Sequence, residues 1–390
     1  ELEMAFLHDG IPRPTKEALY EKVDHASPAM HADLDASAAL LKIMAEPNVA
    51  SKEWIIRQYD HEVQGGSVIK PLVGVDEDAP GDGAVVRPVL DSYRGVAISC
   101  GMNPHLGDLD PYQSGLHAID EALRNSVAVG GNVDHLALLD NFCWGNCNKP
   151  DRMGSLVQAA KACRDAALAY GTPFISGKDS LNNEFQTDAG ETIAIPPTLL
   201  ISAVSVVEDS RKCVSSDAKN AGNALFVLGR TGSKLGGAHL LKAMGVETGN
   251  DVPEVDMATN LKTFRALQAA IEAGTVRACH DLSEGGLAVA AVEMAFAGGL
   301  GVALNLDAVP TSDDAAGAVA KLFAEDAGRF LVEVTPENHD AFLRLVKDGP
   351  VGELGKVTDT GRTVCTAGGE VVLDVAGTEA KAAWQGTFDW

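Results

Sequence analysis

The chain has 390 residues, of which 46% are hydrophobic, and a formal charge of −24. This length is sufficient for two or three domains, and no apolar run approaches the ~18 residues that a membrane span needs. The negative charge argues against non-specific binding to nucleic acid or anionic membranes, whose phosphates attract Lys and Arg. The sequence therefore predicts a globular protein that binds neither nucleic acid nor a membrane.

The seven cysteines are scattered along the chain. Cys143 and Cys147 form the nearest pair, and no second pair follows at the spacing of zinc ligands. We therefore expect reduced thiols and a cytoplasmic location. The chain opens with "ELEMAFLHDG", without an initiating Met or the apolar segment of a signal peptide, which favours a fragment or a processed chain.

Two helices are predicted before residue 67, over 15–26 and 32–46, separated by Pro and Ser. They form no domain of their own.

Alternating strands and helices then predict an α/β unit. "HLALLD" (135–140) is typical of a buried strand, Asn148 can cap the following helix, and Gly171 ends that helix. "TPFIS" (172–176) returns as a strand, which places Lys178 just past a strand's carboxyl end. Ligand sites of open α/β sheets lie there.

A polar stretch over 210–223 is interpreted as a linker to a second α/β unit. The elements expected in this unit are strands at 224–229, 276–281, 301–306, 329–334, 351–357 and 370–375, with helices at 261–274 and 287–299.

Glu121 and Asn125 are four residues apart in "AIDEALRNS", so they share one helix face. A carboxylate and an amide oxygen one turn apart can both bind Mg²⁺, which prefers oxygen ligands. From spacing alone, a solvated polar face is the simpler interpretation.

In "CHDLSEGGLAVAAVEMA" (279–295), a strand delivers Asp281, and a helix after Gly286 points its positive N-terminus back at the loop. This arrangement suits a phosphate held with Mg²⁺ on Asp281. An Asp or Ser cap on an ordinary helix explains the pattern equally well. His280 fits a packed imidazole better than a base.

"GTPFISGKDSLNNEF" (171–185) lacks the glycine spacing of a Walker phosphate loop. Lys178 could neutralise a phosphate there, while Ser180 and the Gly177 backbone supply hydrogen bonds. A surface Lys at a strand end is the alternative, and Asp82 in "GDGAVVRP", taken alone, marks only a turn.

Together these segments resemble phosphoribosylformylglycinamidine synthase, of the aminoimidazole ribonucleotide synthetase-like superfamily. The matching stretches follow the family's order from Ala50 onward: "ASKEWIIRQYDHEVQGGSVIKPLVG", "GDGAVV", "AIDEALRNSVAVGG", "LLDNFCWGNCNKPDRM", "ISGKDSLNNEF" and "CHDLSEGGLAVAAVEMAF".

The resemblance implies an α/β fold and the second half of the family's enzyme. Residues 1–66 would be the tail of the preceding half and a linker. Residues 67–209 would form an A domain whose strands pair with a partner A domain, and residues 210–390 a mixed-sheet B domain. The family's catalytic histidine belongs to the first half, so no catalytic residue is expected in this chain.

The resemblance also implies two groups of site residues. The first group surrounds an auxiliary nucleotide site, with Ser283 beside the nucleotide and metal ligands at Asp82, Glu121, Asn125 and Asp281. The second group reaches into the active site with ATP- or substrate-binding residues Asp140, Gly177, Lys178 and Ser180. The short bacterial form has a metal-binding Asn where this chain has Lys178, and an ammonium cannot bind Mg²⁺, so we expect Lys178 to contact phosphate.

The implied function is part of a purine-biosynthesis ligase, which converts formylglycinamide ribonucleotide, ATP and glutamine-derived ammonia to the amidine, ADP and phosphate. The implied cofactors are ATP or ADP and Mg²⁺, and the implied partners are the N-terminal half and a glutamine amidotransferase. This chain alone would be inactive and could homodimerise through its A domain. Two alternatives remain: a structural half that holds ADP and Mg²⁺ without turnover, and another ATP-dependent member of the superfamily.

Overall fold

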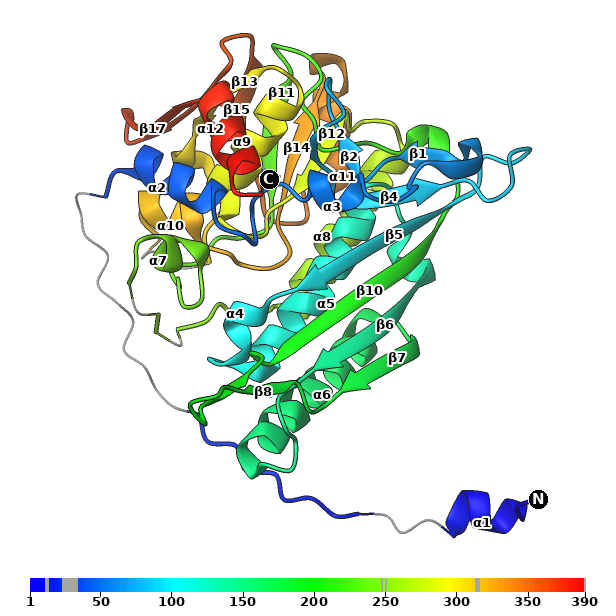
Figure 1. Ribbon diagram of the computed structural model, residues 1–390. Helices are drawn as coiled ribbons and strands as arrows, with labels where there is room; N and C mark the ends of the chain where they lie inside the picture. Colours follow the sequence, from blue (N-terminus) through cyan, green and yellow to red (C-terminus); the bar gives the residue numbers. More distant parts are fainter. Residues whose placement is uncertain (11–13, 23–33, 247, 250, 313–315, 389–390) are drawn as a thin grey trace.

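The computed structural model describes residues 1–10, 14–22, 34–246, 248–249, 251–312 and 316–388. Its strands form two large sheets with helices packed between and around them (Figure 1). The six-stranded sheet has the order β1 (Ser67–Ile69), β4 (Gly83–Val86), β5 (Gly95–Met102), β10 (Thr198–Val207), β6 (Leu136–Cys143) and β7 (Phe174–Ser180). Its strands are antiparallel except β6 and β7, which run parallel.

Two long helices, α5 (Pro111–Ala128) and α6 (Pro150–Tyr170), cover one face of this sheet. Side chains alternate along the strands, so that residues of one parity on β10 are buried and their neighbours are half-buried. The face away from the helices carries the apolar side chains of Ile98 and Met102, which are 46% and 38% exposed.

The seven-stranded sheet has the order β12 (Ala278–Asp281), β14 (Phe330–Val334), β11 (Ala224–Leu228), β15 (Val351–Thr358), β13 (Gly301–Asn305), β16 (Arg362–Ala367) and β17 (Glu370–Ala376). Its hydrophobic residues divide between two clusters. One cluster includes residues of α2 (Ala36–Met44), α9 (Gly286–Ala297) and α12 (Gly377–Gly386). The other includes residues of α8 (Met257–Glu272) and α11 (His339–Val346).

The second of these clusters also contains the buried residues of α5 and α6, so the two sheets share a continuous core. Phe264 on α8 stacks on Tyr170 of α6 and meets Phe330 of β14 edge to face. Apolar burial of this extent is the main force that holds the two units together.

The remaining helices are short: α1 (Met4–Asp9), α3 (Glu53–Ile56), α4 (Pro104–Gly107), α7 (His239–Ala243) and α10 (Ala318–Phe323). Five 3₁₀ turns occur at η1 (Val63–Gly65), η2 (Val133–His135), η3 (Ser210–Lys212), η4 (Leu306–Ala308) and η5 (Pro336–Asn338). Two small hairpins pair β2 (Leu72–Val73) with β3 (Ala79–Pro80) and β8 (Glu184–Gln186) with β9 (Thr192–Ala194). Across the described ranges, no helix has both the length and the apolar character for a membrane crossing.

The prediction of a helix over 15–26 is wrong for its described part, 15–22, which has no helical structure. The backbone N–H of Leu19 donates instead to Pro150 O at 2.9 Å, so this segment is hydrogen-bonded to the start of α6. A Cβ on Gly154 would lie 1.9 Å from Leu19 O, so only glycine allows this close approach. The helix predicted over 32–46 is confirmed over Ala36–Met44 as α2, capped by Asp35, while residues 32–33 lie outside the described residues.

Two details of the first unit also differ from the predictions. Lys149, not Asn148, is the N-cap residue of α6, because Pro150 occupies the first helical position. Lys178 lies inside β7 and not past its end, since pairing with β6 continues to Ser180 opposite Cys143.

Candidate functional site

The first group of predicted site residues lines one cavity of about 220 Å³, where α5, the start of β4 and the end of β12 meet. Its members are Asp82, Glu121, Asn125, Asp281 and Ser283. We call it the acid cavity; further polar or charged residues that line it include Asn48, His280, Glu284 and Glu293. The structure therefore brings together residues that are up to 200 positions apart in the chain.

Helix α5 supplies two of these side chains. Its first turn is fixed by Asp110, which accepts the backbone N–H of Gln113, and by Pro111 at the first helical position. Glu121 and Asn125 are one turn apart on the same helix and both face the cavity. The interpretation of this pair as a solvated helix face is wrong, because Asn125 is only 8% exposed.

Asp281 is the last residue of β12, and the loop that follows carries Ser283. Gly285 and Gly286 have φ of +74° and +65°, a region that favours glycine. A Cβ on Gly286 would also lie 2.5 Å from the carbonyl oxygen of Ala324. These glycines let α9 begin directly behind the loop.

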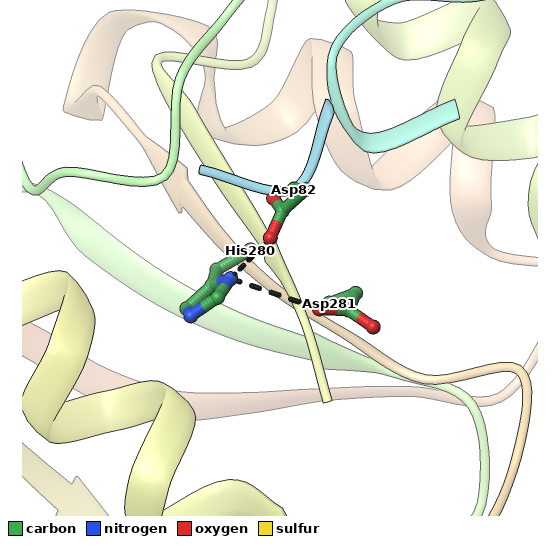
Figure 2. A group of neighbouring side chains, drawn as sticks. All are labelled: Asp82, His280 and Asp281. Carbon is green, nitrogen blue, oxygen red and sulfur yellow. Dashed lines mark hydrogen bonds and ion pairs between the residues drawn. The ribbon is translucent and has the colours of Figure 1, made fainter. Parts of the chain in front are cut away.

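His280 lies between two carboxylates. Its Nδ1 is 2.6 Å from Asp82 Oδ1, and its Nε2 is 3.0 Å from Glu293 Oε2. Figure 2 shows the imidazole pointing towards Asp82, with Asp281 Oδ1 also within 3.8 Å of Nδ1. The prediction of a packed imidazole is confirmed, since His280 is only 6% exposed. Both ring nitrogens also contact a carboxylate, from Asp82 and from Glu293.

Burial alone would lower the pKa of His280, but the carboxylates of Asp82 and Glu293 raise it well above its usual range. Burial raises the pKa of Asp82 to about 6, although the neighbouring imidazole opposes this shift. Both ring nitrogens of His280 are within hydrogen-bond distance of a carboxylate, so the imidazole bridges two acidic groups. It is not a free base.

Glu121 and Glu284 make the cavity strongly acidic. Burial raises the pKa of Glu121 well above its usual range, and the nearby Glu284 carboxylate raises it further. Burial also raises the pKa of Glu284. The Glu121 Oε2 atom accepts one hydrogen bond, from the backbone N–H of Met102 at 3.0 Å. A bound cation would relieve this repulsion.

Two buried oxygens in the cavity accept no hydrogen bond from any part of the chain that the structure describes: Asp82 Oδ2 and Asn125 Oδ1. Leaving such atoms unsatisfied costs about 1 to 3 kcal/mol each. Ligand atoms of Asp82, His280 and Asp281 also lie within 4.8 Å of one another. Oxygen donors of this type fit a hard divalent cation such as Mg²⁺.

Arg124 was not anticipated as part of the site. It is 4% exposed, and its Nε donates to Asp281 Oδ2 at 2.9 Å while Nη2 donates to Ser283 Oγ at 2.8 Å. Nη1 donates to Asp120 Oδ1 at 2.7 Å. One feature of the sequence could have identified Arg124. It lies between Glu121 and Asn125 on the predicted helix, next to both candidate ligands.

The second predicted group lies elsewhere, on β6 and β7. Asp140 is opposite Gly177 in the parallel pairing, and a Cβ on Gly177 would lie 2.4 Å from Asp140 Oδ1. Lys178 is exposed and Ser180 is half-buried, with its hydroxyl donating to Asn183 Oδ1 at 3.0 Å. We call these four residues the β7 strip. None of them lines the acid cavity.

A larger cavity, about 550 Å³, lies beside α3. Its charged side chains, Glu53 and Arg57, pair with each other at 2.5 Å, and none of the predicted site residues lines it. The first group of predicted site residues therefore lines the smaller cavity, and no predicted site residue lines the larger one.

Two family models match the chain. Residues 80–207 match the N-terminal domain of AIR synthase related protein, and residues 220–368 match its C-terminal domain. The residues that line the acid cavity come from both matched regions, since Asp82, Glu121 and Asn125 lie in the first and Asp281 lies in the second.

Similar folds occur in solved structures at low identity. Thermotoga maritima PurL complexed with FGAR has a TM-score of 0.68 and 19% identity, covering 88% of this chain and 53% of that one. Phosphoribosylformylglycinamidine synthase II from T. maritima gives 0.67 and 18%, covering 89% and 52%. The hydrogenase maturation protein HypE in complex with ATP gives 0.55 and 18%, covering 74% and 86%.

The chain thus spans about half the length of the PurL structures it resembles. The two domain matches together account for most of its residues, in the N-terminal to C-terminal order of the family. The chain belongs to the AIR synthase related proteins.

Proposed function

We propose that the acid cavity binds an adenine nucleotide through Mg²⁺, with Asp82, Glu121, Asn125 and Asp281 as metal ligands and Ser283 beside the phosphates. The observation that carries this proposal is the pair of buried, unsatisfied oxygens, Asp82 Oδ2 and Asn125 Oδ1. Structures of T. maritima PurL with ATP and with ADP, which share the fold, support the choice of nucleotide.

The residues of the acid cavity have different roles in this proposal. Asp82 and Asn125 offer free oxygens, and Glu121 adds a carboxylate whose repulsion with Glu284 a cation would relieve. The charged His280 holds the other oxygen of Asp82 in place. A bound magnesium nucleotide would supply phosphate groups and neutralise the charge of this site.

We further propose that the chain is the second half of phosphoribosylformylglycinamidine synthase, with divisions at 1–66, 67–209 and 210–390. In this proposal it acts with an N-terminal half and a glutamine amidotransferase, and the β7 strip contacts ATP and substrate with Lys178 on phosphate. Support comes from the exposed position of Lys178 on the open sheet edge and from the match to half of the PurL chain. The stretches "YDHEVQGG" and "DNFCWGNCNKP" favour this enzyme over other members of the superfamily.

A structural role for the nucleotide is the second candidate. It is favoured by the commitment of His280, the imidazole at the cavity, to two carboxylates. Without a free base the cavity could hold ADP and Mg²⁺ without turnover. A ligand that binds only the folded state adds about 3 to 4 kcal/mol at 100 to 1,000 times its Kd.

Thermal unfolding of the wild type, Asp281→Asn and Lys178→Ala with and without ADP and Mg²⁺ tests the nucleotide site. We expect the ligands to stabilise the wild type and Lys178→Ala, but not Asp281→Asn. Equal stabilisation of all three variants would overturn the assignment.

Turnover with the missing half added separates the two roles. If Asp281→Asn loses ADP stabilisation but retains turnover, the site is structural; if it loses both, the site is catalytic.

The exposed apolar face of the six-stranded sheet is the proposed pairing surface for a partner A domain. Ile98, Met102 and Ile175 are 46%, 38% and 64% exposed on β5 and β7. We propose that the isolated chain pairs with a second copy there. Native mass measurement should give twice the chain mass, and Ile98→Lys should return it to the monomer. A wild-type monomer at micromolar concentration would contradict this.

A further inference from the structure

Arg124 connects the two halves of the acid cavity. It belongs to α5, the helix that carries Glu121 and Asn125, but its side chain reaches Asp281 at the end of β12 and Ser283 in the loop that follows. An ion held by α5 and Asp281 together requires oxygens from both elements at about 2.1 Å. The relative position of the two elements therefore decides whether the ligands can converge.

The guanidinium is itself held in a fixed position. Asp120, which is fully buried, accepts from Arg124 Nη1 and from the backbone N–H of Gly328 through Oδ1. Its Oδ2 accepts from the Tyr170 hydroxyl at 2.8 Å and from Asn260 Nδ2 at 2.7 Å. Four donors from α5, α6, α8 and the loop before β14 thus anchor the carboxylate on which Arg124 rests.

The two carboxylate oxygens of Asp281 have different partners. Oδ2 accepts from Arg124 Nε and from the Ser283 hydroxyl. Oδ1 is the oxygen nearer to the His280 imidazole, at 3.8 Å from Nδ1. With one oxygen saturated by the protein, Asp281 presents the other to the cavity.

The positive charge of Arg124 lies beside this carboxylate and favours its ionised form. Burial alone would raise the pKa of Asp281, but the Arg124 guanidinium, together with His280, more than offsets burial and lowers it. Arg124 stays protonated at any physiological pH, so this effect does not depend on a titrating group.

We propose that Arg124 is a positioning residue that fixes Asp281 as a ligand through a single oxygen and sets the spacing between α5 and β12 for cation binding. This inference rests on the proposed function of the acid cavity. Hydrogen-bond partners of metal ligands typically change metal affinity by roughly 10- to 100-fold when replaced.

The test is Mn²⁺ binding to the full chain without nucleotide, followed by electron paramagnetic resonance, for the wild type, Arg124→Lys and Arg329→Lys. Lysine keeps the positive charge of Arg124 but loses the planar fork that bonds Asp120, Asp281 and Ser283 at once. Arg329 is the matched control, because it is fully buried and bonds the backbone of Ala324 and Asp326 and the Thr231 hydroxyl, but no predicted ligand.

We expect Arg124→Lys to raise the Kd for Mn²⁺ by about tenfold or more and to alter the Mn²⁺ spectrum, while Arg329→Lys leaves both unchanged. Equal Mn²⁺ affinity of Arg124→Lys and the wild type overturns the inference and leaves the proposed function intact. Equal losses in both variants also overturn it, because they indicate a general loss of packing. If the wild type binds no Mn²⁺, the proposed function fails and the inference with it.

Should Arg124→Lys fail to fold, Ser283→Ala decides the question. It removes one bond to Arg124 and one to Asp281 Oδ2, and we expect a Kd for Mn²⁺ higher by about threefold or more, as the loss of these two hydrogen bonds predicts. An unchanged Kd would contradict the positioning role.

Discussion

The acid cavity and the β7 strip contain the two groups of predicted site residues, and the fold surrounds them in different ways. In the acid cavity, acidic side chains from α5, α9, the end of β12 and the adjoining loops line one cavity, and two oxygens lack a hydrogen-bond donor among the described residues. In the β7 strip, Asp140 and Ser180 are half-buried and Lys178 is exposed on an edge strand.

The difference indicates what each region needs. The acid cavity brings its acidic side chains together within the described chain, and a bound cation would offset their repulsion. The β7 strip lies on an edge strand with Lys178 exposed, and in the proposed function a partner domain would supply the surface that encloses a ligand there. A site of the first kind should act in the isolated chain, and a site of the second kind should not.

The largest difference is expected between Asp120→Ala and Asp140→Ala. Removing Asp120 takes one of its two carboxylate partners from the buried Arg124 and leaves three more donors without an acceptor, which should cost about 3 to 5 kcal/mol. Asp140 is half-buried on the open sheet, and its removal should cost less than about 1 kcal/mol. Urea denaturation measures the free energy of unfolding of both variants. Equal losses of stability would contradict the difference between the acid cavity and the β7 strip.

Glu121→Gln should change the unfolding temperature by a smaller amount. The variant should be more stable than the wild type without a divalent cation, and it should gain less from Mg²⁺ and ADP. Without a divalent cation, loss of the repulsion between Glu121 and Glu284 should raise the unfolding temperature by about 2 to 4 °C. With Mg²⁺ and ADP, the variant should gain less stability than the wild type because a ligand charge is missing. Calorimetry in both buffers provides the check, and a lower unfolding temperature without cation would contradict this account of the cavity.

The wall of the acid cavity should respond to pH through His239. Its Nε2 is 3.3 Å from Nδ2 of Asn48, which lines the cavity, and its Nδ1 is 3.1 Å from Glu325 Oε1. Burial alone would lower the pKa of His239, but the Glu325 carboxylate raises it above 6.5. The pair therefore contributes stability that is fully present below about pH 6.5 and is lost as the pH rises through the folded-state pKa.

Stability curves of the wild type and His239→Gln from about pH 5 to about pH 9 should therefore converge at the alkaline end. His339 is a matched control, since its pKa is also raised, by Glu353, but it lies in an exposed pair. His339→Gln should change the curve little. A constant difference between the wild type and His239→Gln at every pH would show that its charge is not involved.

The smallest effect is expected for Lys178→Ala in the isolated chain. The side chain is exposed, so stability should change by no more than about 0.5 kcal/mol, and ADP binding should not change. The same variant should lower turnover once the N-terminal half is present. Loss of ADP binding in the isolated chain would place the nucleotide at the β7 strip and contradict the comparison.

Periodicity and capping predicted much of the fold. The α2 and α6 helices and six of the seven strands of the second sheet were expected from their apolar patterns, whereas β16 (Arg362–Ala367) was not predicted. The domain matches confirm the α/β class. The segment 15–22 was mistaken for a helix because its composition suits one, whereas its backbone bonds to the start of α6. Local propensity does not contain that tertiary contact.

The site was predictable in part. The glycine-rich loop and the i, i+4 pair pointed to Asp281, Glu121 and Asn125, but their convergence came from the resemblance and not from spacing. Arg124 was not predicted as a site residue, because an Arg side chain between two predicted metal ligands is expected to point to solvent. Only the packing of α5 against β12 shows that it points inward.

Anomalous diffraction from crystals of the wild-type chain soaked in Mn²⁺ and ADP tests the central claim most directly. The account predicts a manganese peak within coordination distance, about 2.2 Å, of oxygens from Asp82, Glu121, Asn125 and Asp281. A peak at the β7 strip, or an acid cavity without manganese while ADP is bound elsewhere, would contradict it.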